Sequence, residues 1–156
     1  MKNVMKWCLL AVLMMSMITP VFAHCEIPCG IYGDSLRFEL IREHVLTIEK
    51  SMKMINELST AEQPDYNQLV RWVNNKDEHA EKIQDIVSQY FLHQRVKPVK
   101  STDKAAYTKY TTELELLHKI SISAMKCKQG TDPVHPIKIR QDLKLFEDLY
   151  FGKHEH

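Results

Sequence analysis

Glycine is scarce in this chain, with four residues among 156, and the glycine-rich signatures of common enzyme sites are missing. The sequence has no G-x-G-x-x-G, no phosphate-binding P-loop and no G-x-S-x-G nucleophile motif. It therefore gives no support to a dinucleotide-binding enzyme, a P-loop nucleotidase or an α/β-hydrolase.

An excess of charge of either sign is also missing. The formal net charge is +1, and there is no basic patch of the kind that binds nucleic acid, so we expect no nucleic-acid partner. Strictly alternating apolar and polar segments, internal repeats and low-complexity tracts are absent, which disfavours a sheet or a repeat architecture.

The first 23 residues are typical of a removable leader. Lys2 and Lys6 precede an apolar stretch from Leu9 to Ile18, and Val21-Phe22-Ala23 resembles a signal-peptidase site. The stretch is too short to span a bilayer comfortably, although an uncleaved membrane anchor is the alternative. We expect residues 1–23 to be removed, leaving one exported domain, 24–156, in the periplasm or medium, with no stable membrane insertion. Without the leader's two lysines, 19 basic residues face 20 acidic ones, a formal charge of −1.

Apolar residues recur at three- and four-residue steps through the rest of the chain, which predicts four helices. These are expected from Asp34 or Ser35, acting as N-cap, to about Leu58, and over about 65–94, 102–126 and 136–150. Short connections between such helices favour an all-α, up-down-up-down four-helix bundle. The preceding residues 24–33 contain proline and glycine without such a period, which predicts an irregular N-terminal hook. The expected core residues are Leu40 or Ile41, Val45, Ile48, Met52, Ile55, Leu58, Leu69, Val70, Val73, Ala80, Ile83, Val87, Tyr90, Ala106, Tyr110, Leu114, Leu117, Ile120 or Ile122, Ile139, Leu143, Phe146 and Tyr150.

The chemistry of the chain is concentrated in residues 24–32, His-Cys-Glu-Ile-Pro-Cys-Gly-Ile-Tyr, called the hook segment below. Cleavage after Ala23 would make His24 the N-terminal residue. Its amine nitrogen, the amide nitrogen of Cys25 and the Cys25 sulfur can close two five-membered chelate rings. The Cys29 sulfur can take a fourth, planar corner, and the His24 imidazole can reach an axial position.

This donor set indicates the metal. Zinc prefers a tetrahedron, whereas a square-planar site favours nickel(II) or copper(II). A deprotonated amide and two thiolates are strong donors that bring trivalent nickel within reach. Copper would bind more tightly on raw affinity, so its exclusion has to come from the conditions of delivery or of export.

The hook segment resembles the nickel-hook signature H-C-x-x-P-C-G-x-Y of nickel-containing superoxide dismutases. The resemblance extends over the mature chain, more loosely after the hook, where it includes Gln89-Tyr90-Phe91. It implies a homohexamer of four-helix bundles with one nickel ion per chain, which disproportionates superoxide to dioxygen and hydrogen peroxide while nickel cycles between its divalent and trivalent states.

The resemblance also implies roles for individual residues. His24, Cys25 and Cys29 would hold the metal, and together with Tyr32, which would line the substrate pocket, they form the catalytic set. Glu39 would hydrogen-bond the His24 imidazole. The resemblance assigns the second pocket tyrosine to Tyr90, and it implies a basic residue near the site that the sequence does not place.

Plainer interpretations remain open for the same residues. Cys25 and Cys29 could form a disulfide in an oxidising compartment, and the protein could be an exported, non-enzymatic metal carrier. Glu39 could be an ordinary solvated helix residue, and Tyr90 could simply pack in the core or at an interface. Cys127 is expected to be a part-buried small hydrophobe without a role in the site.

Overall fold

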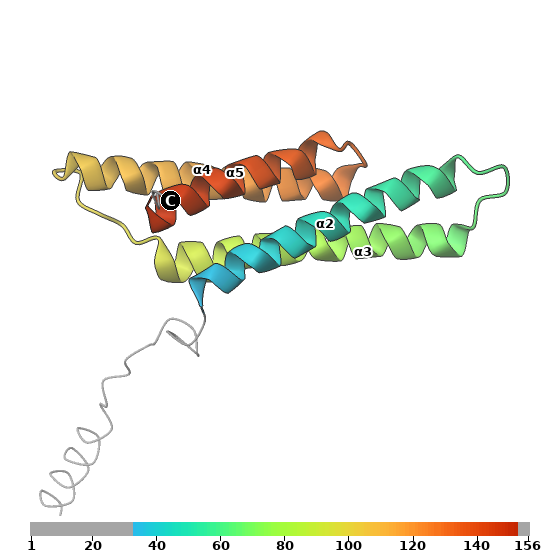
Figure 1. The fold of residues 1–156 in the computed structure, drawn as a ribbon, viewed down its shortest axis with the longest axis horizontal. Coiled ribbons are helices and arrows are strands. Elements are labelled where there is room, and N and C mark those ends of the chain that lie inside the picture. Colours follow the sequence, from blue (N-terminus) through green and yellow to red (C-terminus); the bar gives the residue numbers. More distant parts are fainter. Residues whose placement is uncertain (1–32, 153–156) are drawn as a thin grey trace, which may run out of the picture.

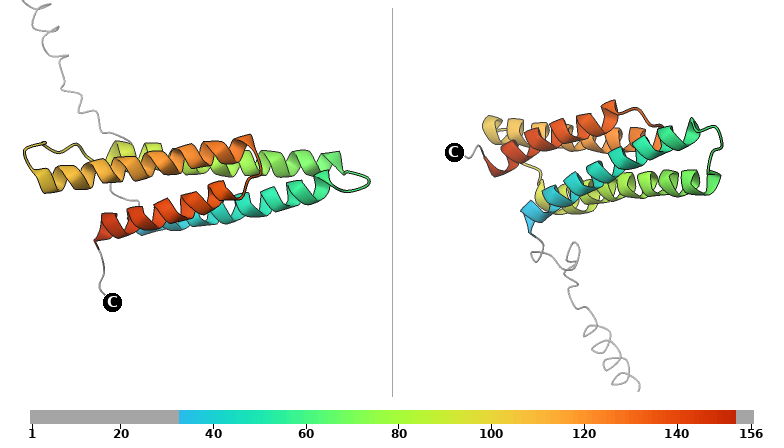
Figure 2. Two further views of the ribbon diagram at one scale, coloured as in Figure 1. Left: turned by 90° about the horizontal axis from the view of Figure 1, so that it is seen from above. Right: turned by 45° about the vertical axis from the view of Figure 1, so that its right-hand side comes forward.

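The computed structural model describes residues 33–152, and the hook segment lies outside this range. The described chain is an all-α bundle of two packed helical layers (Figures 1 and 2), which confirms the predicted fold class. α2 packs along α3, α4 packs along α5, and the two pairs meet through α3 with α4 and α2 with α5. The elements in chain order are α2 (Asp34–Ser59), α3 (Tyr66–Asp85), the π-helix η1 (Ile86–Arg95), α4 (Lys104–Gln129) and α5 (Val134–Phe151).

Side-chain caps explain where two of the helices begin. The Asp65 carboxylate accepts a hydrogen bond from the Gln68 backbone N–H at 3.0 Å, and Asp103 does the same for Ala106 at 3.1 Å. Each cap satisfies one of the N–H groups that the first helical turn leaves without a partner. These capped starts put α3 and α4 within two residues of their predicted positions.

The other two starts differ from the sequence interpretation. Gly33 is the N-cap of α2, and Asp34 is its first helical residue, so the Asp34 side chain is available for another contact. α5 begins at Val134, two residues earlier than expected, with Pro136 inside its first turn. Proline is tolerated there because the N–H groups of the first turn have no intrahelical partner.

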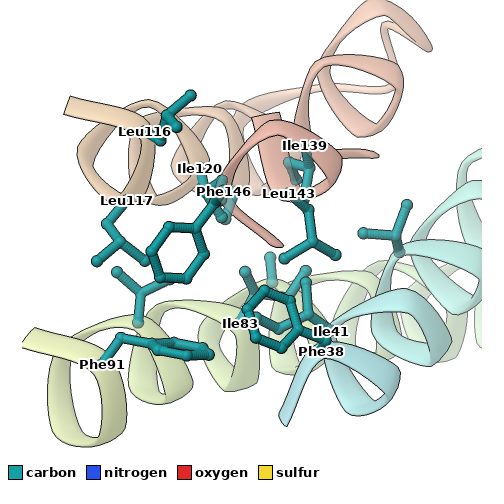
Figure 3. Packing of buried hydrophobic residues seen from close by; sticks show 14 of the residues in the cluster. Phe38, Ile41, Ile83, Phe91, Leu116, Leu117, Ile120, Ile139, Leu143 and Phe146 are labelled. Atoms are coloured by element: carbon teal, nitrogen blue, oxygen red, sulfur yellow. The ribbon is translucent and has the colours of Figure 1, made fainter. Parts of the chain in front are cut away.

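One hydrophobic core runs through the bundle (Figure 3). Most of the predicted core residues are buried, and Ile120 rather than Ile122 is the buried member of its pair. The prediction was wrong for Val70, which is 56% exposed. The sequence interpretation also missed two phenylalanines, Phe38 and Phe91, which are fully buried.

Phe38 is the centre of an aromatic cluster near the start of α2. Its ring lies 5.1 Å from Phe91, 5.4 Å from Phe146 and 5.8 Å from Tyr150, measured between centroids. These separations lie within the range of favourable aromatic pairs. The cluster therefore ties α2, η1 and α5 together at one end of the bundle.

Replacing Phe38 should test how much that end depends on the cluster. We expect Phe38→Ala to lower the free energy of unfolding by about 3–5 kcal/mol, because it removes buried surface and leaves a cavity. Leu36→Ala, at a 54% exposed position of the same helix, should change it by no more than about 0.5 kcal/mol. Urea denaturation of the two variants measures both values, and equal losses would contradict this account.

Lys76 and Cys127 form a structural contact between α3 and α4. The Lys76 amino group is buried and donates to the backbone oxygens of Cys127 at 2.5 Å and Lys128 at 3.0 Å, with Asp77 as its ion-pair partner at 2.7 Å. It thereby satisfies carbonyls in the last turn of α4. Cys127 is fully buried, and burial raises the pKa of its thiol to about 12. Cys127 is therefore a structural cysteine, as expected, but it is fully buried rather than part-buried.

Candidate functional site

The segment that contains the predicted metal donors directly precedes α2 in the sequence. His24, Cys25, Cys29 and Tyr32 lie outside the described residues, so their contacts remain predictions. Tyr32 precedes Asp34 by two residues, a stretch of backbone that spans at most about 7 Å. Asp34, the first residue of α2, is therefore the helical residue nearest to the hook segment along the chain.

Four polar side chains meet at this point, and we call Asp34, Tyr90, Arg95 and Tyr150 the Asp34 cluster. The Asp34 Oδ1 atom accepts a short hydrogen bond from the Tyr90 hydroxyl and lies 2.9 Å from Arg95 Nε. The Tyr150 hydroxyl donates to Asp34 Oδ2 at 3.0 Å. Arg95 Nη2 donates to the Tyr90 hydroxyl oxygen at 3.0 Å. A single carboxylate thus joins the start of α2 to η1 and to the end of α5.

The π-helical turn of η1 explains why Tyr90 and Arg95 can meet. In this geometry backbone bonds join residues five apart, as in the 2.8 Å bond from Val96 N to Phe91 O. Residues five apart then share a face, which an α-helix with 3.6 residues per turn does not provide. The expected continuous helix over residues 65–94 therefore needs correction, since the chain follows the wider π-helical path from Ile86 to Arg95. Turns of this kind occur frequently at functional sites.

Burial and hydrogen bonding keep the two phenols of the cluster protonated. Burial, followed by the hydrogen bond to Asp34, raises the pKa of Tyr90 above its usual 10.0. The same two causes raise the pKa of Tyr150. The hydrogen bond to Tyr90 is the largest cause of the raised pKa of Arg95. At neutral pH the cluster therefore has two hydroxyl donors and one guanidinium around one carboxylate.

A second cation lies next to the cluster. The Arg37 guanidinium carbon is 5.1 Å from the centre of the Tyr90 ring, and the Arg95 guanidinium carbon is at the same distance. Both distances lie within the range of cation–π attraction. Two guanidinium groups and one carboxylate therefore surround Tyr90. Arg37 and Arg95 are candidates for the basic residue that the sequence did not place.

Glu39 lies apart from this arrangement. Its side chain is 68% exposed and pairs with Arg42 at 2.6 Å, and Arg42 also contacts Glu147 at 2.5 Å. Within the described range, Glu39 belongs to this surface ion-pair chain and is not bonded to the Asp34 cluster. Its predicted role beside the His24 imidazole remains a prediction.

Three other kinds of feature are relevant to the described helices: clusters of metal-ligating side chains, membrane-spanning helices and surface hollows. Residues 33–152 contain no group of three or more histidine, cysteine, aspartate or glutamate side chains placed to hold one metal ion. No helix in that range is long and apolar enough to cross a membrane. Two surface hollows, of about 420 and 410 Å³, lie along α3 near Trp72 and between α2 and α5 near Met52, and residues of the Asp34 cluster line neither.

The raised pKa values of the phenols make stability depend on pH. The folded state holds the phenolic protons more tightly than the unfolded state. This stabilisation is therefore complete below pH 10.0, the usual phenol value, and is lost as the pH rises through the folded-state values. We expect the parent chain to lose more stability than Tyr150→Phe between about pH 8 and about pH 11. Urea denaturation at both pH values measures the difference.

Tyr107→Phe is the matched control for this measurement, because Tyr107 is 41% exposed. It should show the same pH dependence as the parent. If Tyr150→Phe behaved like Tyr107→Phe, the Asp34 cluster would not hold its protons as described.

One known protein family matches nearly the whole chain. The sequence model described as nickel-containing superoxide dismutase matches residues 19–154, which include the hook segment and all the described helices. No curated protein and no solved structure gives a significant match.

Proposed function

Since the chain belongs to the nickel-containing superoxide dismutase family, we propose that His24, Cys25 and Cys29 hold its nickel and that Tyr32 lines the site. Membership makes the protein a nickel-dependent oxidoreductase that acts on superoxide. The observation that carries the proposal is that the family match includes the one segment that combines a potential N-terminal histidine with two nearby cysteines.

The donor atoms of the hook segment suit nickel in particular. After cleavage at Ala23, the His24 amine, the Cys25 amide nitrogen and the sulfurs of Cys25 and Cys29 would form a two-nitrogen, two-sulfur set. Strong donors of this type favour a square-planar divalent nickel ion. When bound, nickel would supply one-electron chemistry, with its divalent and trivalent states exchanging an electron with successive superoxide ions.

The charged residues near Asp34 would attract superoxide toward this metal. Superoxide is an anion, and positive potential near a site increases the rate of capture. The mature chain has a formal charge of −1, which does not attract an anion. The attraction therefore has to be local, and Arg37 and Arg95 provide positive charge beside Tyr90. Asp34 holds Arg95 in place through the 2.9 Å ion pair.

Tyr90 would orient water and substrate rather than give up its own proton. Its raised pKa keeps the hydroxyl protonated, and that hydroxyl already donates to Asp34 and accepts from Arg95. The protons that peroxide formation consumes would then come from water. Together, Tyr32 and Tyr90 would restrict access by larger anions.

The two oxidation states can be tested on the purified protein. We expect a low-spin trivalent nickel signal in the electron paramagnetic resonance spectrum of the isolated protein, and its loss on reduction with dithionite. The same sample should accelerate the decay of a superoxide pulse, and a nickel-free sample should not. Nickel-loaded protein that binds the metal but leaves superoxide decay unchanged would favour the carrier interpretation.

Replacing Tyr90 with phenylalanine should separate positioning from metal binding. Tyr90→Phe keeps the ring beside Phe91 but removes the hydrogen bonds to Asp34 and Arg95. We expect nickel content to stay at one ion per chain while kcat/KM for superoxide falls several-fold, at a stability cost of about 1–2 kcal/mol. Pulse radiolysis and metal analysis measure the two quantities, with Tyr107→Phe as control. An unchanged kcat/KM would mean that Tyr90 only packs.

We also propose a location and an assembly. The leader pattern of residues 1–23 supports export, and family resemblance supports a homohexamer. N-terminal sequencing of secreted material and light scattering of the purified protein test these two points separately.

A further inference from the structure

A pair of histidines lies between α2 and α3, away from the Asp34 cluster. His44 and His79 are 35 residues apart in sequence, and their Nδ1 atoms are 3.0 Å apart. The ring centroids are 4.9 Å apart, and the ring planes meet at 76°. His44 follows Asp34 by ten residues, which is about 15 Å along a helix axis. The pair is therefore separate from the site at the start of α2.

The separation of the two nitrogens fits a shared metal ion. With metal–nitrogen bonds of about 2.05 Å, a 3.0 Å separation corresponds to an angle of about 95° at the metal. A tetrahedral ion needs the nitrogens about 3.3 Å apart, which small rotations of the two rings can provide. The separation of the two nitrogens thus suits a square-planar ion and comes close to what a tetrahedral ion needs.

We propose that His44 and His79 form a second metal site, which binds a divalent late transition-metal ion such as zinc, copper or nickel through the two Nδ1 atoms. Imidazole is a preferred ligand of these ions. Both side chains are only partly buried, so water can complete the coordination. With two protein ligands and open positions, the site resembles an exchangeable site rather than a closed structural one.

The surroundings of the pair are compatible with a bound cation. Glu43 acts electrostatically on both imidazoles, and Glu78 acts on His79. The nearby cation is Lys82, whose amino group is paired with Glu78 at 2.6 Å. Two carboxylates and one ammonium group therefore leave this region with a formal charge of −1.

The lowered pKa values favour the neutral rings that a metal needs, and binding through both Nδ1 atoms would place the remaining proton of each ring on Nε2. Burial is the largest cause that lowers the pKa of each ring. For His44 the next causes are electrostatic interactions with His79 and then Lys82. For His79 the next cause is the charge of Lys82. Neutral rings keep a lone pair available for a metal. The competing interpretation is a simple N–H···N hydrogen bond between the two rings, in which no metal takes part.

The bound ion would link α2 to α3. Because both ligands lie on helices that pack along each other, the folded state presents them together and the unfolded chain does not. A ligand that binds only the folded state raises the unfolding temperature as its concentration rises. The site is therefore expected to stabilise the bundle independently of nickel in the hook segment.

Zinc titration of the full chain tests the proposal, with Cys25 and Cys29 both replaced by serine to remove the hook thiolates. We expect competition against a chromophoric chelator to show a zinc site that is weakened at least about tenfold in His44→Gln and in His79→Gln. His118→Gln, at an exposed position of α4, is the matched control and should bind zinc as the parent does. Zinc should also raise the unfolding temperature of the parent and of His118→Gln, but not of His79→Gln.

A second measurement needs no substitution of either histidine. Long-range nitrogen–proton NMR of the same chain, with Cys25 and Cys29 replaced by serine, reports on each imidazole ring. Zinc should shift the Nδ1 signals of His44 and His79 first. If the first rings to shift belonged to the tail histidines, His154 and His156, the proposal would be overturned. Equal zinc affinity in the parent and in His79→Gln would overturn it as well.

Discussion

A chain that keeps Ala23 in front of His24 should fold as the same bundle but hold no nickel and remove superoxide no faster than buffer. The extra residue turns the His24 amine into a peptide amide and removes a donor and one five-membered chelate ring. The described core lies entirely in residues 33–152, so its packing should not change. Metal analysis, circular dichroism and superoxide decay measure the three quantities.

The matched control is the same polypeptide released to begin at His24 and loaded with nickel under identical conditions. Its far-ultraviolet spectrum and unfolding temperature should match those of the extended chain, while only the processed form carries metal. Full nickel content and full activity in the extended chain would show that the amine is not a ligand.

Removing either hook thiolate should have an effect of similar size. Cys25→Ser and Cys29→Ser replace a strong, polarisable donor with a hydroxyl that is a poor ligand for nickel. We expect superoxide removal to fall to background in each variant, with an unchanged helical spectrum. Pulse radiolysis gives the rates, and the trivalent nickel signal should be lost in both variants.

Cys127 supplies the control for these substitutions. It is fully buried in the bundle, and burial raises the pKa of its thiol to about 12. Alanine is a better replacement than serine there, because a buried hydroxyl would need a hydrogen-bond partner. Cys127→Ala should lose some stability yet keep its activity per nickel ion. A loss of activity in Cys127→Ala as complete as in Cys25→Ser would contradict the assignment of the metal to the hook.

The sequence carried enough information for the helices because their buried faces repeat at helical spacing. Ile41, Val45 and Ile48 follow this spacing and are buried as predicted. Val70 also fits the spacing, but it lies in the second turn of α3, where its side chain is 56% exposed. Periodicity alone does not show which positions of a helix are covered by a neighbouring helix. It also does not distinguish the π-helical turn of η1 from an α-helix, because the difference lies in backbone bonding.

The two parts of the candidate site differ in how far a sequence can reveal them. The hook motif is readable because its donors are neighbours in the chain. The Asp34 cluster is not, because Asp34 lies 56 residues from Tyr90 and 116 from Tyr150. The sequence predicts only a helix-capping role for Asp34, whereas its carboxylate binds two phenol hydroxyls and Arg95. The resemblance of Tyr90 to a pocket tyrosine was the one signal that pointed to this end of the bundle.

The most direct test is native mass spectrometry of protein purified from the cells that make it, followed by fragmentation to read the first residue. The account predicts a chain that begins at His24 and carries one nickel ion. A chain that begins at another residue, or one that carries zinc or no metal with Cys25 and Cys29 joined as a disulfide, would contradict it.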